Sequence, residues 1–383
     1  MKKECYAMIY LVACGVNRIK PDMKYISDID MEVLFRLSTY HLVEVLAGTS
    51  LKEAGTALPE QWTQKLSKSM RKNILFDNER KKIFDFMEQS GIWYLPLKGT
   101  VLKDYYPSVG MRQMSDNDIL FDGTFSDRVR TYMESQGYVS ESHGKGAHDV
   151  YMKNPVYNFE LHRTLFEESG QPIMSRYYAD VKERLILNDG SSYGYHFSDE
   201  DFYIYTVAHA YKHYSGSGTG IRSLLDFYVY LSAKEQSMDF EYIDRECEKI
   251  GLFEFEKQSR ALCKKVFGKQ ALTSYEQFTD SLSAKEQEML GYYLSSGVYG
   301  TTERGIKNRI SGFREKSGST SKFRYLVNRL FPDMEMYKSY YPFFYRHKLL
   351  LPIGWLYRLL RMIFSKKRRN SAVKEIGMVR KYE

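Results

Sequence analysis

The chain has 383 residues, enough for two or three domains and a substantial buried core. Hydrophobic residues make up 43% of the sequence and charged residues 27%, which is ordinary for a soluble globular protein. The net charge is +8, but residues 346–383 alone carry eleven Lys and Arg against two Glu, so the other 345 residues sum to about −1. A basic tail on a nearly neutral body gives no reason to expect general nucleic-acid binding.

Cysteine content and hydropathy indicate in which cellular compartment the protein is expected. Four cysteines are too few and too scattered for a disulfide framework, and no pair of them has the spacing of a zinc site. A reducing, cytoplasmic location is therefore expected. The sequence contains no stretch of about 18 apolar residues, so no transmembrane helix is expected.

Residues 1–75 are predicted to be helical. An apolar run at residues 6–13 follows two lysines, and residues 11–14 resemble a bacterial lipoprotein cleavage site. Glu4 interrupts the charged region and the run is short for a signal peptide, so a first core helix is the favoured interpretation. Residues 31–47 then carry apolar side chains at the three-and-four spacing of an amphipathic helix.

The pattern changes at Ile92, where short apolar runs rich in aromatic residues indicate buried strands. We predict strands at residues 92–97, 118–121, 148–152 and 156–162, and helices at 79–89, 101–106 and 125–136. Mixed strands and helices over this length suggest one compact α/β unit at residues 76–198.

Beyond Asp199 the chain is predicted to be helical again. Periodic apolar segments occur at residues 202–214, 221–231, 239–267 and 281–296. Residues 304–320 are rich in Gly, Ser and charge, which predicts a linker or mobile loop. We therefore expect an α+β protein in which the small mixed-sheet core is flanked by an N-terminal helical region (1–75), a helical domain (199–300) and a linker with a basic helical tail (301–383).

The most informative motif is Asp116-Asn117-Asp118, which enters a predicted strand. Two acids at i and i+2 project to the same side, so both carboxylates can hold a hard divalent cation such as Mg²⁺. Alone, the motif is weak evidence, because it also occurs in metal-dependent glycosyltransferases and in solvated turns.

Two further features favour a nucleotide site. Lys98, Gly99 and Thr100 form a strand-to-helix turn, where a glycine permits close approach of a ligand and a helix start offers free amides to a phosphate. Glu160 is an acid in an otherwise apolar strand. A buried carboxylate without a partner is costly, so a metal or a basic partner would explain it; an edge-strand Glu facing water is the alternative.

Several polar residues are secondary candidates, each with a plain structural alternative. Arg112 can bind a phosphate bidentately or can be a solvated loop residue. His209 and His213 lie one helical turn apart, with Lys212 beside them, and either reach nucleotide phosphates or are simply packed. One more pair, Arg222 and Asp226, has the spacing of an ordinary helix ion pair.

Together these motifs resemble the nucleotidyltransferase superfamily with the DNA polymerase β palm, and in particular a bacterial group of uncharacterised nucleotidyltransferase family proteins. The matching segments, over roughly residues 30–365, are Leu97-Lys98-Gly99, Tyr105-Tyr106-Pro107, Arg112 with Met114-Ser115-Asp116 and Asp118, Glu160-Leu161-His162, His209, His213, Leu225-Asp226, Leu330-Phe331-Pro332 and Tyr341-Pro342. The resemblance implies that Asp116, Asp118 and Glu160 are the metal carboxylates. Thr100 and Glu160 depart from the commoner Ser or Gly and Asp of the superfamily.

The implied reaction transfers a nucleoside monophosphate from a nucleoside triphosphate such as ATP to an unidentified acceptor, with two Mg²⁺ or Mn²⁺ ions. Lys98, Gly99, Thr100, Arg112, Ser115, His209, Lys212 and His213 are the candidate nucleotide- and phosphate-binding residues. A catalytically silent nucleotide-binding protein and a glycosyltransferase remain as alternatives.

The tail has its own pattern. Residues 349–364 form an apolar, Trp-bearing helical segment, and four consecutive basic residues follow at 366–369. Such a helix can lie on an anionic membrane surface, or it can dock on the core with a solvated basic end.

Overall fold

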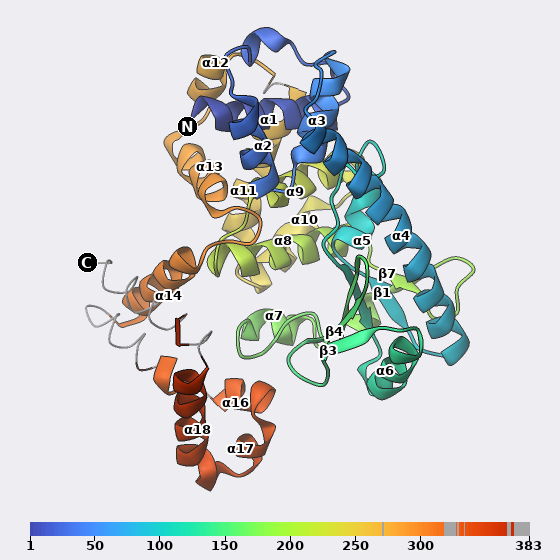
Figure 1. Ribbon diagram of the computed structural model, residues 1–383. Helices are drawn as coiled ribbons and strands as arrows, with labels where there is room; N and C mark the ends of the chain where they lie inside the picture. Colours follow the sequence, from blue (N-terminus) through green and yellow to red (C-terminus); the bar gives the residue numbers. More distant parts are fainter. Residues whose placement is uncertain (270–271, 318–326, 328, 333, 366–368, 371–383) are drawn as a thin grey trace.

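The computed structural model describes residues 1–269, 272–317, 327, 329–332, 334–365 and 369–370, and it confirms the expected α+β architecture (Figure 1). Helices surround a five-stranded mixed sheet with the order β1-β2-β5-β4-β3. The strands are β1 (Tyr94–Pro96), β2 (Asn117–Phe121), β3 (Val139–Ser142), β4 (His148–Lys153) and β5 (Tyr157–His162). A separate two-stranded hairpin consists of β6 (Ile186–Leu187) and β7 (Tyr195–His196).

Strand pairing places the two acidic strands side by side. β2 pairs with β5 in parallel, while β1 pairs with β2, and β4 with both β5 and β3, in antiparallel fashion. Successive side chains along a strand point to opposite faces of the sheet. Ile119 and Phe121 of β2 therefore share one face with Phe159 and Leu161 of β5, and all four are buried in one apolar cluster. The intervening polar residues occupy the opposite face.

Two helices cover the apolar face of the sheet. They are α4 (Glu60–Ser90), which runs along the right side of the molecule in Figure 1, and α6 (Ser126–Ser135). Ile83 and Met87 of α4 and Val129 and Met133 of α6 complete the apolar cluster. The boundary predicted between residues 75 and 76 falls inside the continuous helix α4, so this helix joins the N-terminal helices to the sheet.

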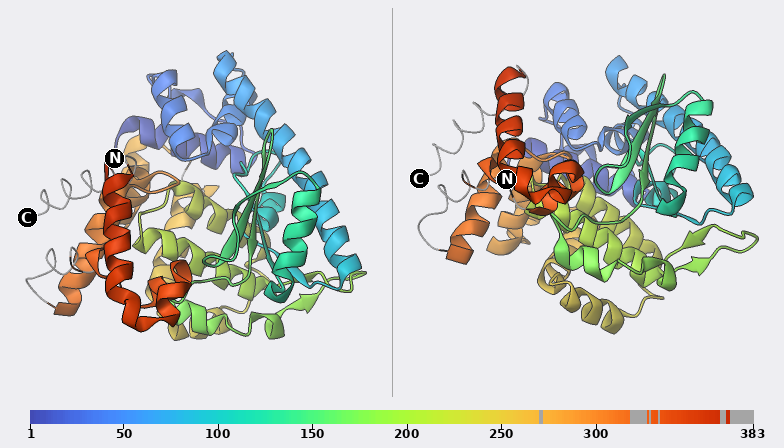
Figure 2. Two further views of the ribbon diagram at one scale, coloured as in Figure 1. Left: turned by 60° about the horizontal axis from the view of Figure 1, so that its bottom comes forward. Right: turned by 90° about the horizontal axis from the view of Figure 1, so that it is seen from below.

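The remaining helices build a second, larger core, seen from two further sides in Figure 2. They are α1 (Lys3–Val16), α2 (Met31–Tyr40), α3 (Glu44–Glu53), α5 (Gly99–Leu102), α7 (Pro172–Tyr177), α8 (Asp199–Ser215), α9 (Ile221–Lys234), α10 (Phe240–Lys249), α11 (Phe253–Phe267), α12 (Tyr275–Asp280) and α13 (Ala284–Ser296). Short 3-10 helices lie at Met23–Tyr25, Lys103–Tyr105, Gly123–Phe125, Val181–Arg184 and Lys348–Leu350.

Helix α1 lies within this larger core and contacts α2, α3 and α11. Ten consecutive residues, 6–15, are buried on every side of the helix. A helix that is apolar all round is expected in the interior of a protein. The favoured interpretation of residues 6–13 as a first core helix is thus confirmed.

Two local predictions differ from the structure. Residues 304–317, predicted as a linker or mobile loop, belong to the helix α14 (Thr302–Ser317); residues 318–320 lie outside the described part of the chain. Ile306 and Ile310 stand one turn apart and are both buried, which gives this polar segment an apolar side. The edge strand β3 was not predicted, because its alternation is weak and Val139 is exposed.

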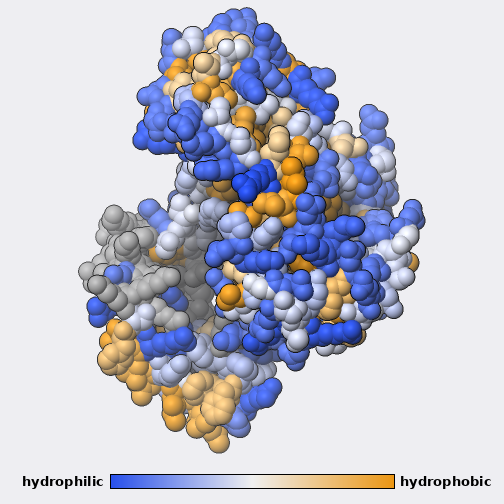
Figure 3. Space-filling view, turned by 45° about the vertical axis from the view of Figure 1, so that its right-hand side comes forward, coloured by the Kyte–Doolittle hydropathy of each residue, from blue (hydrophilic) through white to orange (hydrophobic). Residues whose placement is uncertain are grey.

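The C-terminal helices form a separate group: α16 (Met334–Tyr340), α17 (Pro342–Arg346) and α18 (Leu351–Phe364). On the exposed side of η6 (Lys348–Leu350) and α18, apolar side chains repeat at three- and four-residue intervals, and apolar colour gathers on this group at the lower left of Figure 3. The stripe consists of Leu349, Ile353, Leu356, Leu360, Ile363 and Phe364. None of the described helices combines the length and apolarity needed to cross a bilayer. Of the basic cluster at 366–369, Arg369 alone is described.

Candidate active site

The polar face of the sheet carries the acidic residues found in the sequence. Asp118 and Glu160 are direct register partners on the parallel strands β2 and β5, so their side chains stand next to each other. His162 follows two residues after Glu160 on the same face, and Asp116 precedes Asp118 by the same interval. Because their neighbours Ile119 and Leu161 anchor the opposite face, the acids are fixed facing away from α4 and α6.

This face opens into a pocket of about 340 Å³ between the sheet, the turn before α5 and the helices α8 and α9. Of the residues predicted from the sequence, nine line it: Lys98, Gly99, Arg112, Ser115, Asp116, Asp118, Glu160, His209 and His213. Two, Thr100 and Lys212, do not. The other lining residues are Leu102, Tyr205, Thr206, Ala210, Thr219, Arg222, Ser223, Asp226, Phe227, Val298 and Tyr299.

Asp118 is the best-compensated acid of the group. Lys98 Nζ donates to its Oδ1 at 2.6 Å, and His162 Nε2 lies 2.9 Å from the same oxygen. Burial opposes the charged form, but Lys98 and His162 outweigh it and hold the pKa of the Asp118 carboxyl well below its usual range. Asp118 is therefore an anion with two polar partners already in place.

Asp116 and Glu160 are not compensated in this way. Burial and the neighbouring Asp118 raise the pKa of Asp116. Burial, Asp118 and Asp116 together raise the pKa of Glu160 to about 7. Three carboxylates that disfavour one another's charge, with Lys98 as the cation among them, match the donor set that a hard divalent cation requires. The residues present thus fit a metal ion.

The turn before α5 has a distinctive backbone. Lys98 adopts a positive φ of 50°, which is uncommon for a residue with a side chain. A Cβ on Gly99 would overlap the guanidinium of Arg112 and come within 2.9 Å of Met114 Sδ. A glycine is therefore needed at this position because the side chain of Arg112 packs closely against its backbone. Thr100 is buried and its Oγ1 has no hydrogen-bond partner among the described residues, so its phosphate contact remains a prediction.

Asp226 is paired with Arg112 rather than with Arg222, the helix neighbour whose spacing suggested an ion pair. Arg112 Nε and Nη2 donate to Asp226 Oδ1 and Oδ2 at 2.8 and 2.9 Å, and Tyr106 Oη donates to Oδ1 at 2.7 Å. The guanidinium of Arg112 thus engages both carboxylate oxygens of Asp226, the two-point contact that its fork of donors favours. The predicted phosphate contact of Arg112 is untested, but this buried pair already engages two of its three nitrogens.

The positive charge of Arg222 is less well compensated than that of Arg112. Its Nη1 donates to the backbone oxygen of Gln113 at 3.2 Å, and burial, followed by the charge of Arg112, lowers its pKa. It lines the pocket on the α9 side, facing the sheet that carries Asp116. An arginine whose charge is poorly compensated beside a pocket is a candidate anion ligand, although no phosphate contact was predicted for Arg222.

The two histidines of α8 lie together at the pocket. His209 Nε2 and His213 Nε2 are 3.2 Å apart, within hydrogen-bond distance. Burial and then Lys98 hold the pKa of His209 well below its usual range, so His209 is neutral. Burial, followed by the charge of Lys98, also lowers the pKa of Lys212, which stands next to the pair. Any nucleotide contact of these residues remains a prediction.

Sequence reasoning did not assign a role to two histidines of the sheet. His148 of β4 is the register partner of His162 on β5. In the part of the chain that the structure describes, His148, Glu160 and His162 each offer a ligand atom, and these atoms all lie within 4.8 Å of one another. Burial and Lys98 lower the pKa of both imidazoles, that of His162 to about 4. The two-residue interval between Glu160 and His162 indicated that both side chains lie on the same face of the sheet. Whether His148 lies beside them depends on the order of the strands in the sheet.

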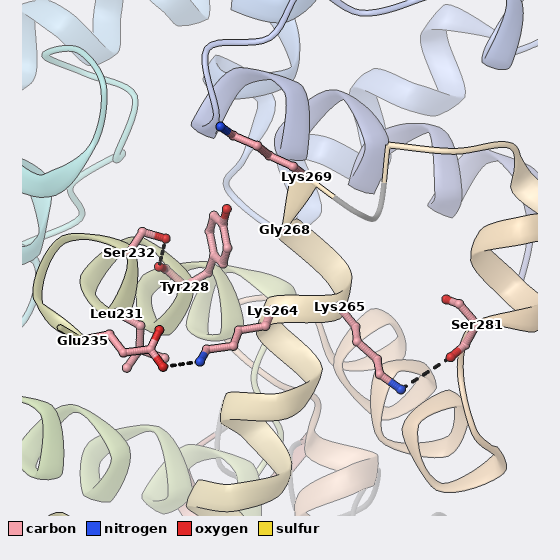
Figure 4. Close-up of a pocket in the computed structure, with 9 residues that line it drawn as sticks. All are labelled: Tyr228, Leu231, Ser232, Glu235, Lys264, Lys265, Gly268, Lys269 and Ser281. Atoms are coloured by element: carbon pink, nitrogen blue, oxygen red, sulfur yellow. Dashed lines mark hydrogen bonds and ion pairs between the residues drawn. The ribbon is translucent and has the colours of Figure 1, made fainter. Parts of the chain in front are cut away.

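A larger hollow of about 680 Å³ lies on the other side of α9, against α11 (Figure 4). Two of its three lysines are engaged: Lys264 pairs with Glu235, and Lys265 Nζ lies 2.9 Å from Glu286 Oε2. No acidic or histidine cluster accompanies them among the residues drawn in Figure 4. The smaller pocket, where carboxylates, imidazoles and arginines converge, is therefore the candidate active site.

Comparison with known proteins identifies the family of the chain. The family model described as uncharacterised nucleotidyltransferase matches residues 27–268, which is more than half of the chain. The protein is thus a nucleotidyltransferase by family: it belongs to that uncharacterised nucleotidyltransferase family. The matched region contains every lining residue of the pocket except Val298 and Tyr299. No curated protein and no solved structure matches the chain at a significant level.

Proposed function

We propose that the protein transfers a nucleoside monophosphate from a nucleoside triphosphate, such as ATP, to an acceptor that is still to be identified. The observation that carries this proposal is the pairing of Asp118 with Glu160 across parallel strands, with Asp116 two residues before, at the floor of a pocket with arginine and lysine side chains. Family membership supports the reaction class.

Mg²⁺ or Mn²⁺, held by Asp116, Asp118 and Glu160, would neutralise charge on the phosphates and on the departing pyrophosphate. Lys98 and Arg222 are the cationic side chains best placed to orient the triphosphate, and both line the pocket. Positioning and charge compensation of this kind supply most of the catalysis in phosphoryl transfer.

The chemical step exchanges one bond at the α-phosphorus for another. A bond forms between an acceptor oxygen and the α-phosphorus, and the bond from that phosphorus to the bridging oxygen breaks, so pyrophosphate leaves with the electron pair. The acceptor proton goes to a carboxylate oxygen of Glu160. Glu160 suits this role by its position, because it stands beside Asp118 and lines the pocket.

One observation favours a silent nucleotide-binding protein as the second candidate. Lys98 and His162 already partner Asp118, so part of the charge that a metal would neutralise is compensated by the protein itself. Such a protein would bind nucleotide without releasing pyrophosphate.

We also propose that the exposed apolar stripe of α18 contacts an anionic membrane surface from the cytoplasmic side. Exposed Lys348, Arg361 and Arg369 lie around the stripe, which gives it the charge that anionic headgroups attract.

Pyrophosphate release and metal-linked stabilisation test the nucleotidyltransferase proposal together. Asp116→Asn and Asp118→Asn each remove one anionic metal ligand and should lower the rate of pyrophosphate release by several orders of magnitude. Mg²⁺ with a triphosphate should raise the melting temperature of the wild type and do much less for either variant. The control is Asp189→Asn, in an exposed loop, which should behave as wild type. Metal-linked stabilisation without pyrophosphate release from any triphosphate would favour the silent binder.

A further inference from the structure

In the cluster of His148, Glu160 and His162, His162 Nε2 is within hydrogen-bond distance of Asp118 Oδ1, but neither imidazole is within hydrogen-bond distance of Glu160. His148 Nε2 lies 3.7 Å from Glu160 Oε2, and His162 Nε2 lies 3.9 Å from the same oxygen. Both distances exceed the range of a hydrogen bond. The imidazole nitrogens of His148 and His162 thus both approach one carboxylate oxygen of Glu160 without forming a hydrogen bond to it.

The same spacing is what a shared metal ion requires. Ligand atoms about 2.0–2.2 Å from a tetrahedrally coordinated ion stand roughly 3.3–3.6 Å apart, and wider ligand angles allow about 4 Å. The two His–Glu distances come close to this range before any ion is bound. The ligand atoms of all three residues lie within 4.8 Å of one another, so the imidazoles must approach each other when an ion binds.

The framework that carries the three ligands is rigid. His148 and His162 are register partners in the antiparallel pair β4·β5, and Glu160 lies two residues before His162 on the same face. Sites built on paired strands hold their ligands more precisely than sites on loops. Asp118 Oδ1 lies 2.9 Å from His162 Nε2, so an ion bound to that nitrogen would replace this hydrogen bond and have the Asp118 carboxylate beside it.

We propose that His148, Glu160 and His162 bind a divalent transition-metal ion such as Zn²⁺ or Co²⁺ in preference to Mg²⁺. Imidazole nitrogen suits these ions, whereas Mg²⁺ selects oxygen ligands and keeps much of its water. The proposal deepens the proposed function, because it assigns a nitrogen-rich metal position next to the all-oxygen pair of Asp116 and Asp118. The site binds its ion without nucleotide, since all three ligands come from the protein.

Direct metal binding tests the proposal without any assay of turnover. The full-length protein is stripped with a chelator and titrated, without nucleotide, with Zn²⁺, Co²⁺ or Mg²⁺, and bound metal is measured by equilibrium dialysis. We expect one equivalent of Zn²⁺ or Co²⁺ to bind at concentrations at which Mg²⁺ does not, and bound Co²⁺ to show the visible absorption of nitrogen ligation. His148→Gln and His162→Gln should each weaken Zn²⁺ binding by at least ~100-fold, because even loss of an outer-shell partner costs 10–100-fold.

His196→Gln is the matched control, because His196 is an exposed histidine outside the pocket, and it should bind Zn²⁺ as wild type does. Circular dichroism checks that each variant is folded. His162 is buried, so if His162→Gln fails to fold, the more exposed His148→Gln decides the outcome. Wild-type Zn²⁺ affinity in His148→Gln, or equal affinity of the wild type for Mg²⁺ and Zn²⁺, would overturn the proposal.

The two proposals fail separately. A protein that binds Zn²⁺ through His148 and His162 but never releases pyrophosphate refutes the proposed function and leaves the metal site standing. A protein that turns over with Mg²⁺ and binds no Zn²⁺ without nucleotide refutes the metal site alone.

Discussion

At the residue scale, two acids with the same proposed role differ in their contribution to stability. Asp118 is paired with Lys98 and His162, whereas Asp116 has a pKa raised by burial and by Asp118. Removing one partner of a buried ion pair leaves an uncompensated charge, which costs about 3–5 kcal/mol. Removing the charge of a carboxylate whose charged form is already disfavoured by its surroundings costs little free energy of unfolding.

We therefore predict that Asp118→Asn lowers the free energy of unfolding by about 3 kcal/mol in metal-free protein, while Asp116→Asn leaves it unchanged or raises it. Urea unfolding in the presence of a chelator measures both. Equal destabilisation by the two variants would show that the Lys98–Asp118 pair does not have the importance given to it here.

Glu160 gives a prediction about pH. Its pKa is raised to about 7 in the folded protein, from 4.5 for an ordinary glutamate. Between these values the folded state binds more protons than the unfolded state, so the free energy of unfolding falls as the pH rises from about 4.5 to about 7. In the variant Glu160→Gln this fall in the free energy of unfolding with rising pH is absent.

The measurement is the difference in unfolding free energy between Glu160→Gln and wild type, taken in chelator across pH 4 to 8. We expect the difference to grow in favour of the variant up to about pH 7 and to level off above it. A difference that stays flat with pH would mean that Glu160 titrates normally.

Sequence reasoning reached some of these residues and missed others for physical reasons. Asp116, Asp118 and Glu160 are visible because acids in an apolar strand pattern stand out. The Arg112–Asp226 pair joins residues far apart in sequence, and the helix spacing of Arg222 and Asp226 suggested a nearer partner. His148 was missed because its neighbourhood depends on which strands pair.

At the element scale, the positions of β1, β2, β4 and β5 were predicted within a few residues, but β3, β6, β7 and the strand order were not predicted. The parallel pairing of β2 with β5 brings Asp118 beside Glu160 across more than forty intervening residues, and nothing local in the sequence specifies it. Helix α14 was hidden by its Gly, Ser and charged residues, although the spacing of Ile306 and Ile310 carried the helical period.

Helix α18 gives the prediction that belongs to this scale. Leu356→Gln together with Leu360→Gln removes two exposed apolar side chains from the stripe and should weaken binding to vesicles containing anionic lipid several-fold, because membrane affinity follows buried apolar area. Vesicle co-sedimentation at low and high salt measures it, with salt weakening the basic contribution.

Leu187→Gln is the matched control, since Leu187 is exposed to a similar extent, 45% against 43% for Leu360, but lies on β6. Neither set of changes touches the pocket, so nucleotide binding should persist in both. Vesicle binding that is unchanged by the α18 variant would leave the stripe without a membrane role.

At the scale of the whole molecule, the pocket is formed where the sheet meets the helices α8 and α9. Arg112 and Tyr106, from the segment between α5 and β2, reach Asp226 on α9 and so link the two parts next to the acids. Composition and periodicity predicted helices on both sides of an α/β core. They did not predict that α4 would be continuous from one part into the other.

The central claim is that the protein transfers a nucleoside monophosphate, and the fate of the α-phosphorus tests it most directly. The wild type is incubated with Mg²⁺ or Mn²⁺, each of four nucleoside triphosphates labelled at the α- or the γ-phosphorus, and a panel of small-molecule, sugar-phosphate, protein and RNA acceptors. We predict that α-label enters a product in proportion to the pyrophosphate released, that γ-label appears only in pyrophosphate, and that Asp116→Asn abolishes both. Transfer of γ-label to an acceptor, or bound nucleotide that yields no α-labelled product with any acceptor, would contradict the account.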